Sequence, residues 1–212
     1  MIIKEFCAEN LTDLHQLDPS DIKRVELCDN LAVGGTTPSY GVIKEASRYL
    51  HDKNISLSVM IRPRGGDFCY NDLELRAMEE DILKAVELEA DALVFGVLTK
   101  ELRIDTEAID YLLPASQGVD LVFHMAFDLI AKEEQKEAID QLVALGFKRI
   151  LLHGSAKKRD IFDNSSHLKE LIAYADNRIE ICLGGGVTAH NYQKLCQDTK
   201  ANYVHGTHIH RI

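Results

Sequence analysis

Short apolar runs of five to seven residues recur along the whole chain and alternate with longer amphipathic segments. These runs are rich in β-branched and aromatic residues, which is typical of β-strands. They predict eight strands, over residues 2–6, 24–28, 55–61, 92–97, 120–125, 149–153, 179–183 and 202–206.

The segments between the predicted strands carry the local signals of helices. Residues 75–90 place apolar side chains at helical spacing, with acidic residues on the opposite face. Helix starts are predicted at Thr37, which precedes a proline, at Asn71, which stands three residues before Glu74, and at Thr188, which follows a triple glycine.

Strands that are joined by helices must run parallel, and eight such units close naturally into a (β/α)8 TIM-type barrel. An open doubly wound sheet is the alternative, but it usually carries a glycine-rich fingerprint after its first strand, where this chain has CAENLTD. No linker or change of composition divides the chain. We therefore predict one barrel domain over residues 1–212, with short loops.

Alternate side chains of a strand share a face, so several polar side chains are expected to point into the barrel together. Such sets are Glu5 with Cys7, Glu26 with Cys28, Met60 with Arg62 and Arg64, and Val122 with His124. We expect them near the carboxyl ends of the strands, where barrel enzymes carry out their chemistry. Because buried carboxylates need partners, Glu5 and Glu26 are expected to pair with Arg62, Arg64 or His124. A purely structural charge network is the competing interpretation.

Composition limits the partners and the compartment. A formal charge of −10 argues against a nucleic-acid partner, which requires a concentrated basic surface. No run approaches the roughly 20 apolar residues of a membrane span, and the N-terminus lacks the pattern of a signal peptide. The sequence therefore predicts a cytoplasmic protein without a membrane partner. Its five cysteines are expected to be reduced thiols.

Glycine and charged residues suggest a pocket for a small anion. Gly184, Gly185 and Gly186 follow the seventh predicted strand, and the loops after strands seven and eight form the usual phosphate site of this fold. Arg62 and Arg64 would bind the anion beside Asp67, although glycines at any one of these places can simply form a turn.

Acid-base chemistry is the second kind of candidate site. His124 and Asp128 suit a general base and its partner, and Glu26 is a further carboxyl group that could move a proton. The competing interpretation is an inward histidine that forms a hydrogen bond and has no further role.

Cysteine placement suggests a metal site. Cys7 and Cys28 occupy matching places on neighbouring strands, and Cys69 follows the Gly65-Gly66 loop, from which it could fold back over the mouth. Thiolates together with an imidazole favour Cu(I) or Zn(II) over Mg(II). Cys182 and Cys196 are interpreted as small buried apolar residues.

The C-terminal histidines were considered as ligands as well. His205, His208 and His210 have a spacing that could hold a divalent ion, but we interpret the cluster as adventitious.

Several motifs together resemble the CutC copper homeostasis family: RVELCDN, GGTTPSYG, RPRGGDFCY, FGVL and FHMAFD. The resemblance covers essentially the whole chain, and the RPRGGDF block is highly specific. It implies a cytoplasmic (β/α)8 barrel that is often oligomeric, a homo-oligomer here, and is associated with copper tolerance through Cu(I) binding. The matching polar residues are Glu5, Glu26, Cys28, Arg62, Arg64, Asp67, Cys69, His124 and Asp128, and Cys7 also fits the pattern.

Two departures from the family pattern stand at the expected mouth. Met125 occupies a position where the family commonly has arginine, and LLHGSA replaces the more usual serine-glycine run after the sixth strand.

Three functions follow as hypotheses. The first is a copper-handling protein that binds Cu(I) through Cys28 and Cys69, with Cys7 or His124 assisting. The second is a barrel enzyme that acts by acid-base chemistry on a small anionic metabolite, a sugar phosphate or a carboxylate. The third, an interaction scaffold, is least favoured, because a scaffold has little reason to direct this much charge inward.

Overall fold

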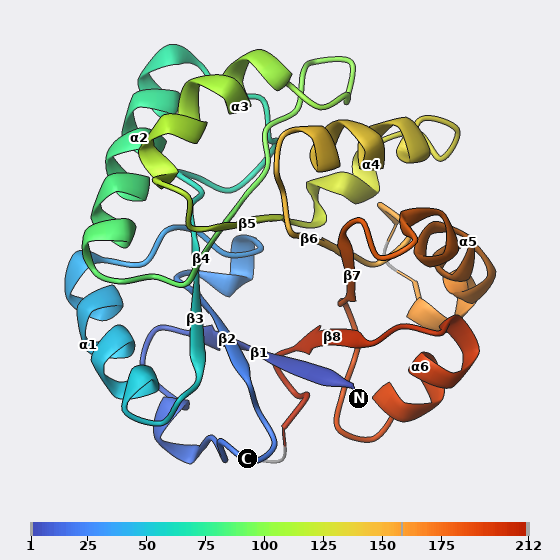
Figure 1. The fold of residues 1–212 in the computed structure, drawn as a ribbon, viewed down its shortest axis with the longest axis horizontal. Coiled ribbons are helices and arrows are strands. Elements are labelled where there is room, and N and C mark those ends of the chain that lie inside the picture. The colour runs from blue at the N-terminus through green and yellow to red at the C-terminus, as the bar shows by residue number, and fades with distance from the viewer. Residues whose placement is uncertain (1, 158, 211–212) are drawn as a thin grey trace.

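Eight parallel strands close into a barrel in the order of the chain, with the first strand paired to the last (Figure 1). The structure is a computed structural model that describes residues 2–157 and 159–210. Its strands are β1 (Ile3–Glu9), β2 (Arg24–Cys28), β3 (Ser56–Met60), β4 (Ala92–Phe95), β5 (Asp120–Phe123), β6 (Arg149–Leu152), β7 (Glu180–Leu183) and β8 (Tyr203–Gly206). The predicted barrel is confirmed, and closure excludes the open sheet.

The helices lie around the outside of the barrel (Figure 1). They are α1 (Tyr40–His51), α2 (Asp72–Glu87), α3 (Thr106–Leu112), α4 (Gln135–Ala144), α5 (Ser165–Ala175) and α6 (Tyr192–Thr199). Between β1 and β2 the chain forms only a single 3-10 turn, Leu14–Gln16, and residues 207–210 after β8 contain no helix. Two of the eight predicted units therefore lack an α-helix in the part of the chain that is described.

Helix starts agree with the sequence at α2 but not at α1. Asn71 and Glu74 form the predicted capping box at α2. The N-cap of α1 is Ser39, whose hydroxyl accepts the N–H of Val42. The predicted cap, Thr37, instead accepts the backbone N–H of Arg62, which follows β3, at 2.9 Å. This hydroxyl therefore joins two loops rather than starting a helix.

The third predicted start is also displaced along the chain. Helix α6 begins at Tyr192, four residues after Thr188. Thr188 pairs with His208 in an isolated parallel β-bridge, so it extends the sheet instead of opening the helix.

Two apolar clusters fill the molecule on the two sides of the barrel wall. The larger lies between strands and helices and contains outward-facing strand residues such as Phe6, Leu27 and Phe95. The smaller is the interior cluster, and its members alternate with those residues along the strands. It consists of Cys7, Cys28, Met60, Ala92, Val94 and Val122, with Leu31 packed against it. The interior of the barrel therefore concentrates sulfur atoms.

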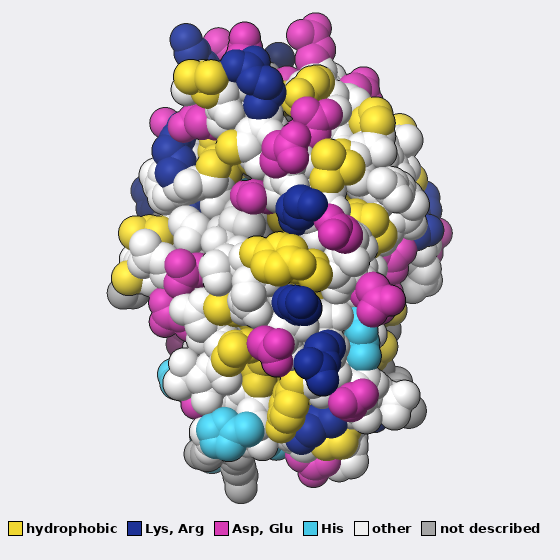
Figure 2. All heavy atoms as spheres, turned by 90° about the vertical axis from the view of Figure 1, so that its left-hand side faces the viewer, with side chains coloured by type: hydrophobic (Ala, Val, Ile, Leu, Met, Phe, Trp, Pro, Cys, Tyr) yellow, Lys and Arg dark blue, Asp and Glu magenta, His cyan; other side chains and the backbone are white. Residues whose placement is uncertain are grey.

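The surface carries charges of both signs. On the face drawn in Figure 2, Lys and Arg side chains are interspersed with Asp and Glu, and no basic field spans this face. Among the described residues, no helix has the length and apolar character needed to cross a membrane.

Candidate functional site

Glu5 lies at the centre of a buried ionic network inside the barrel. Its carboxylate contacts Arg149 Nη1 at 3.2 Å, Arg24 Nε at 3.4 Å and His205 Nδ1 at 2.9 Å. The sequence predicted Arg62, Arg64 or His124 as its partners, and that prediction is wrong. The parallel pairing of β1 with β2 and β8 places Glu5 beside Arg24 and His205 instead.

The arginines of this network come from the amino ends of their strands. Arg24 and Arg149 are the first residues of β2 and β6, and both contact Glu180, the first residue of β7, at 3.0 and 2.9 Å. The network thus extends away from the mouth, contrary to the expectation that the charges gather at the carboxyl ends. Its position favours a structural role for these arginines.

A second group of donor atoms lies next to Glu5, one step closer to the mouth. Ligand atoms of Cys7, Glu26 and His205 lie within 4.8 Å of one another, and all three side chains are buried. The thiol of Cys28 donates to Glu26 Oε1 at 3.5 Å, and Cys28 belongs to the same interior cluster as Cys7. Met60, the last residue of β3, belongs to the same interior cluster.

Burial and proximity set the protonation states in this group. The hydrogen bond from Cys28 holds the pKa of Cys7 down, to about 5, with further help from His205. Burial alone would lower the pKa of His205, but Glu26 and Cys7 raise it well above the usual range. Burial raises the pKa of Glu26 to about 8, against the opposing charge of His205. The directions of these shifts favour a Cys7 thiolate beside a protonated His205, while Glu26 holds its proton more tightly than an ordinary carboxyl group.

A glycine loop covers the sulfur atoms. A Cβ on Gly35 would lie 3.1 Å from Cys28 Sγ and 3.6 Å from Met60 Cε, and the φ of +86° at Gly35 disfavours any other residue. The backbone after β2 can approach the sulfurs only because this position has no side chain.

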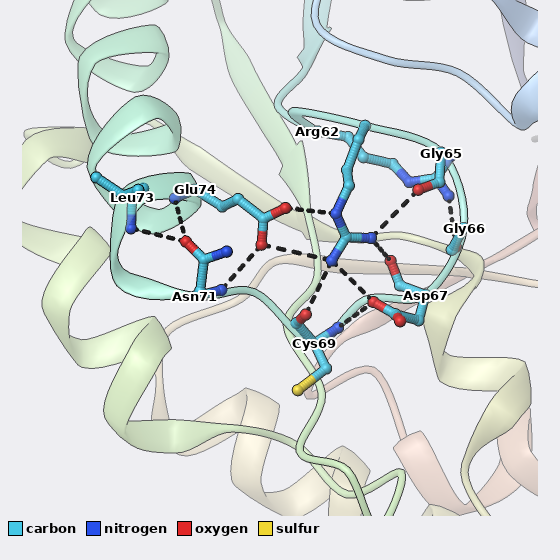
Figure 3. A network of polar contacts seen from close by, with 9 residues as sticks. Arg62, Gly65, Gly66, Asp67, Cys69, Asn71, Leu73 and Glu74 are labelled. Carbon is cyan, nitrogen blue, oxygen red and sulfur yellow. Dashed lines mark hydrogen bonds and ion pairs between the residues drawn. The ribbon is translucent and has the colours of Figure 1, made fainter.

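Arg62 and Arg64 are both engaged with acceptors of the protein. Arg62 donates to the carbonyls of Val33, Gly35 and Gly66, each at 2.9 Å. In Figure 3, Glu74 and Asp67 lie on opposite sides of a central guanidinium group, and the Cys69 carbonyl lies below it. These groups, and the Gly65 carbonyl, are acceptors for the Arg64 guanidinium. The hydrogen bonds of the two arginines hold the loop between β3 and α2 in place. These loop acceptors compete with the anion that the arginines were predicted to bind.

Cys69 and Asp67 belong to the same loop. Asp67 accepts the Cys69 backbone N–H at 3.2 Å, and its side chain is exposed. Cys69 is partly buried and, unlike Cys7 and Cys28, is not a member of the interior cluster.

His124 and Asp128 follow β5 but do not act as a hydrogen-bonded pair. His124 Nδ1 accepts the N–H of Ala126 at 3.3 Å, and its ring stacks on Phe68 with a centroid distance of 4.7 Å. Asp128 accepts the backbone N–H groups of His153 and Gly154, at 2.9 and 2.7 Å. The predicted base and partner are therefore held apart by separate backbone contacts.

Both groups are strongly perturbed. Burial, with Arg62 nearby, lowers the pKa of His124 to about 3, and burial raises the pKa of Asp128 to about 6. His124 Nε2 is also buried without a hydrogen-bond partner among the described residues.

The sequence pattern alone does not single out Arg24, Arg149 or His205. Each of them stands in an otherwise apolar strand, and the two arginines are the first residues of their strands. A charged residue at an inward position of a buried strand was therefore the only sequence signal that could have identified them. His205 was grouped with the C-terminal histidines, but the structure separates them. His205 points into the barrel, His208 is exposed, and His210 contacts Asp21 at 2.8 Å.

A closed parallel barrel with carboxylate, imidazole and thiol groups buried in its interior defines a TIM-barrel protein with a candidate soft-metal centre. Comparison with known proteins identifies the family within this class. The CutC family model matches residues 2–210, and the chain belongs to the CutC family.

Relatives support the assignment over the full length. A CutC family protein of Streptococcus pyogenes is 65% identical over 98% of this chain and 100% of its own length. The human copper homeostasis protein cutC homolog is 36% identical over 96% of this chain and 72% of its own length. A crystal structure of a CutC protein from Streptococcus agalactiae has 70% identity and a TM-score of 0.98, covering 99% of this chain and 100% of that one.

Proposed function

We propose that this protein serves copper homeostasis by binding Cu(I) inside the barrel, through the sulfur atoms of Cys7 and Cys28, in the reducing cytoplasm. One observation carries the proposal: the thiols of Cys7 and Cys28, from neighbouring strands, are both buried in one interior cluster, beside Glu26 and His205. Thiolate and thioether donors select Cu(I), and Met60 supplies a thioether to the same cluster.

The chemistry of the donor set fits a soft monovalent ion. The lowered pKa of Cys7 favours its thiolate, and binding of Cu(I) to both sulfurs would release the proton of the Cys28 thiol. His205 is protonated beside Glu5 and Glu26, so it balances the negative charge of a bis-thiolate site and becomes a ligand only after it loses that proton. Burial keeps water and oxidants away from the sulfur atoms.

This assignment differs from the pair Cys28 and Cys69 expected from the sequence. Cys69 lies on a loop whose backbone is fixed by Arg64 and Asp67, and it stands outside the interior cluster that holds Cys7 and Cys28. Cys7 takes its place because β1 and β2 pair with Cys7 opposite Glu26.

The test compares two double variants that remove the same number of thiols. Cys7→Ser with Cys28→Ser should abolish tight Cu(I) binding, measured by competition with a chromophoric Cu(I) chelator under reducing conditions. Cys69→Ser with Cys196→Ser should keep the affinity and stoichiometry of the unchanged protein. Equal binding by the first variant and the unchanged protein would contradict the proposal, and loss only in the second would restore Cys69 as a ligand.

A further inference from the structure

A cavity of about 480 Å³ opens at the mouth of the barrel, beyond the carboxyl ends of β5, β6 and β7. A volume of this size suits a small metabolite. Its lining comes from four loops and includes Phe68, Met125, Asp128, His153, Lys157, Arg159, Gly185 and Gly186. Neither Cys7 nor Cys28 lines this cavity, so it is distinct from the interior sulfur group.

Two cationic residues of the loop after β6 line the cavity. Lys157 and Arg159 both line it, and neither has an ion-pair partner among the residues that the structure describes. The side chains of Arg62 and Arg64, in contrast, are held by loop carbonyls and carboxylates. The available positive charge at the mouth therefore lies on the β6 side.

The opposite wall supplies backbone donors. Gly185 and Gly186 have φ values of +83° and +89°, and neither N–H has a hydrogen-bond acceptor in the described part of the chain. A Cβ on Gly185 would lie 2.9 Å from the His153 ring and 3.1 Å from Met125 Cε. Glycine here keeps the wall open, and successive free N–H groups form a concavity for an anion.

The one carboxylate in the lining is directed into the protein rather than competing for the cations. Asp128 uses Oδ2 and Oδ1 to accept the N–H groups of His153 and Gly154. It is a positioning residue that fixes the start of the loop carrying Lys157 and Arg159. The remaining lining residues, Phe68, Met125, Leu129 and Ala156, provide an apolar surface for a carbon skeleton.

We propose that this cavity binds a small phosphorylated metabolite, with its phosphate between Lys157, Arg159 and the Gly185 and Gly186 N–H groups, and its carbon skeleton against Phe68. Phosphate matches the two cations and the backbone donors in charge and in acceptor number. The site goes beyond the copper function and does not depend on it.

Metal-free protein is titrated with inorganic phosphate, ribose 5-phosphate, ribose and glycerate, and binding is followed by calorimetry and by ³¹P line broadening. Both phosphates should bind, ribose 5-phosphate more tightly, and ribose should not. Lys157→Ala with Arg159→Ala should weaken ribose 5-phosphate binding by about tenfold or more, since each removes a charge-assisted contact.

The matched control is Lys44→Ala with Arg48→Ala, which removes the same charges from the exposed face of α1. It should bind ribose 5-phosphate as the unchanged protein does. Absence of binding by both phosphates, equal weakening in the two double variants, or binding of glycerate alone would overturn the proposal. Cys7→Ser with Cys28→Ser should leave phosphate binding intact, so failure here and failure of the copper site are distinguishable.

Discussion

Glu5 and Glu26 point into the same barrel from neighbouring strands, yet the pKa values of their carboxyl groups are shifted in opposite directions. Burial disfavours ionisation of both carboxyl groups. At Glu5 the hydrogen bond from His205 and the charge of Arg149 outweigh burial and lower its pKa to about 2. At Glu26 burial prevails and Oε2 has no hydrogen-bond partner among the described residues. The groups that surround each carboxyl group, and not the residue type, therefore decide in which direction its pKa shifts.

Glu5→Gln should therefore destabilise the protein strongly at neutral pH. It leaves Arg24, Arg149 and His205 without their central counter-charge, and breaking a buried pair costs about 3–5 kcal/mol. The pKa of Glu5 is lower in the folded state than in the unfolded chain. Its contribution is thus present above pH 4.5 and is lost as the pH falls towards 2. Urea unfolding of both proteins across this range should show their stabilities converging at acid pH.

Glu180→Gln is the matched control for this prediction. Glu180 contacts the same two arginines, but 34% of its side chain is exposed, so water compensates for its loss. The free energy of unfolding should fall by about 1 kcal/mol or less at neutral pH. Equal destabilisation by the two substitutions would mean that Glu5 is not the centre of the network.

At the scale of elements, the loop from β3 to α2 is held by a carboxylate with two roles. Glu74 accepts the Asn71 N–H in the capping box of α2 and also binds the Arg64 guanidinium (Figure 3). Helix start and loop are therefore one unit.

Glu74→Ala should remove both contacts at once. Loss of the cap and of the ion pair should lower the free energy of unfolding by about 1–2 kcal/mol. It should also expose the Arg64–Gly65 peptide bond to trypsin, while the bond after Arg62 stays resistant because a proline follows. Glu80→Ala, an exposed change on the same helix, should leave both measurements unchanged. Unaltered cleavage in Glu74→Ala would contradict the coupling.

Elements were predictable where a signal is local. Seven of the eight strands lie within their predicted ranges, and β1 continues to Glu9, three residues beyond its predicted end, because an apolar run is a direct signal of a buried strand. The capping box at Asn71 could also be predicted, because its two residues lie only three positions apart. Thr37 and Thr188 failed as helix starts because their competing partners, an N–H beyond β3 and the His208 strand bridge, are distant in sequence. Nothing nearby distinguishes a capping threonine from one that joins two loops.

At the scale of the whole molecule, closure of the barrel creates the candidate copper site. Pairing of β1 with β8 brings His205 to Glu5, across 200 residues of sequence. The sequence indicated that Glu5, Cys7, Glu26 and Cys28 face inward, since alternation along one strand is enough for that. It could not indicate which residues meet, because partners depend on the stagger between strands. His205 and Arg149 were missed for this reason.

Copper binding should consequently stabilise the part of the barrel where β1 and β2 meet β8. Its donors come from β1 and β2, and the neighbouring imidazole comes from β8, so a bound ion would add to the backbone hydrogen bonds and the Glu5 ion pairs that already hold these strands together. Ligand at 100 times its dissociation constant adds about 2.7 kcal/mol to the free energy of unfolding. Hydrogen exchange measured by mass spectrometry should show slower exchange in β1, β2 and β8 of Cu(I)-loaded protein, with β5 and β6 changing least.

The Cys7→Ser and Cys28→Ser double variant supplies the control for this measurement, because it keeps the barrel and removes the sulfur donors. Added Cu(I) should leave its exchange pattern as it is in the metal-free state. Slowing confined to the β3–α2 loop would instead place the ion at Cys69, since that loop carries the thiol outside the interior group. Slowing of the same size in the unchanged protein and in the double variant would show that copper stabilises the protein without Cys7 and Cys28, and the interior site would have to be abandoned.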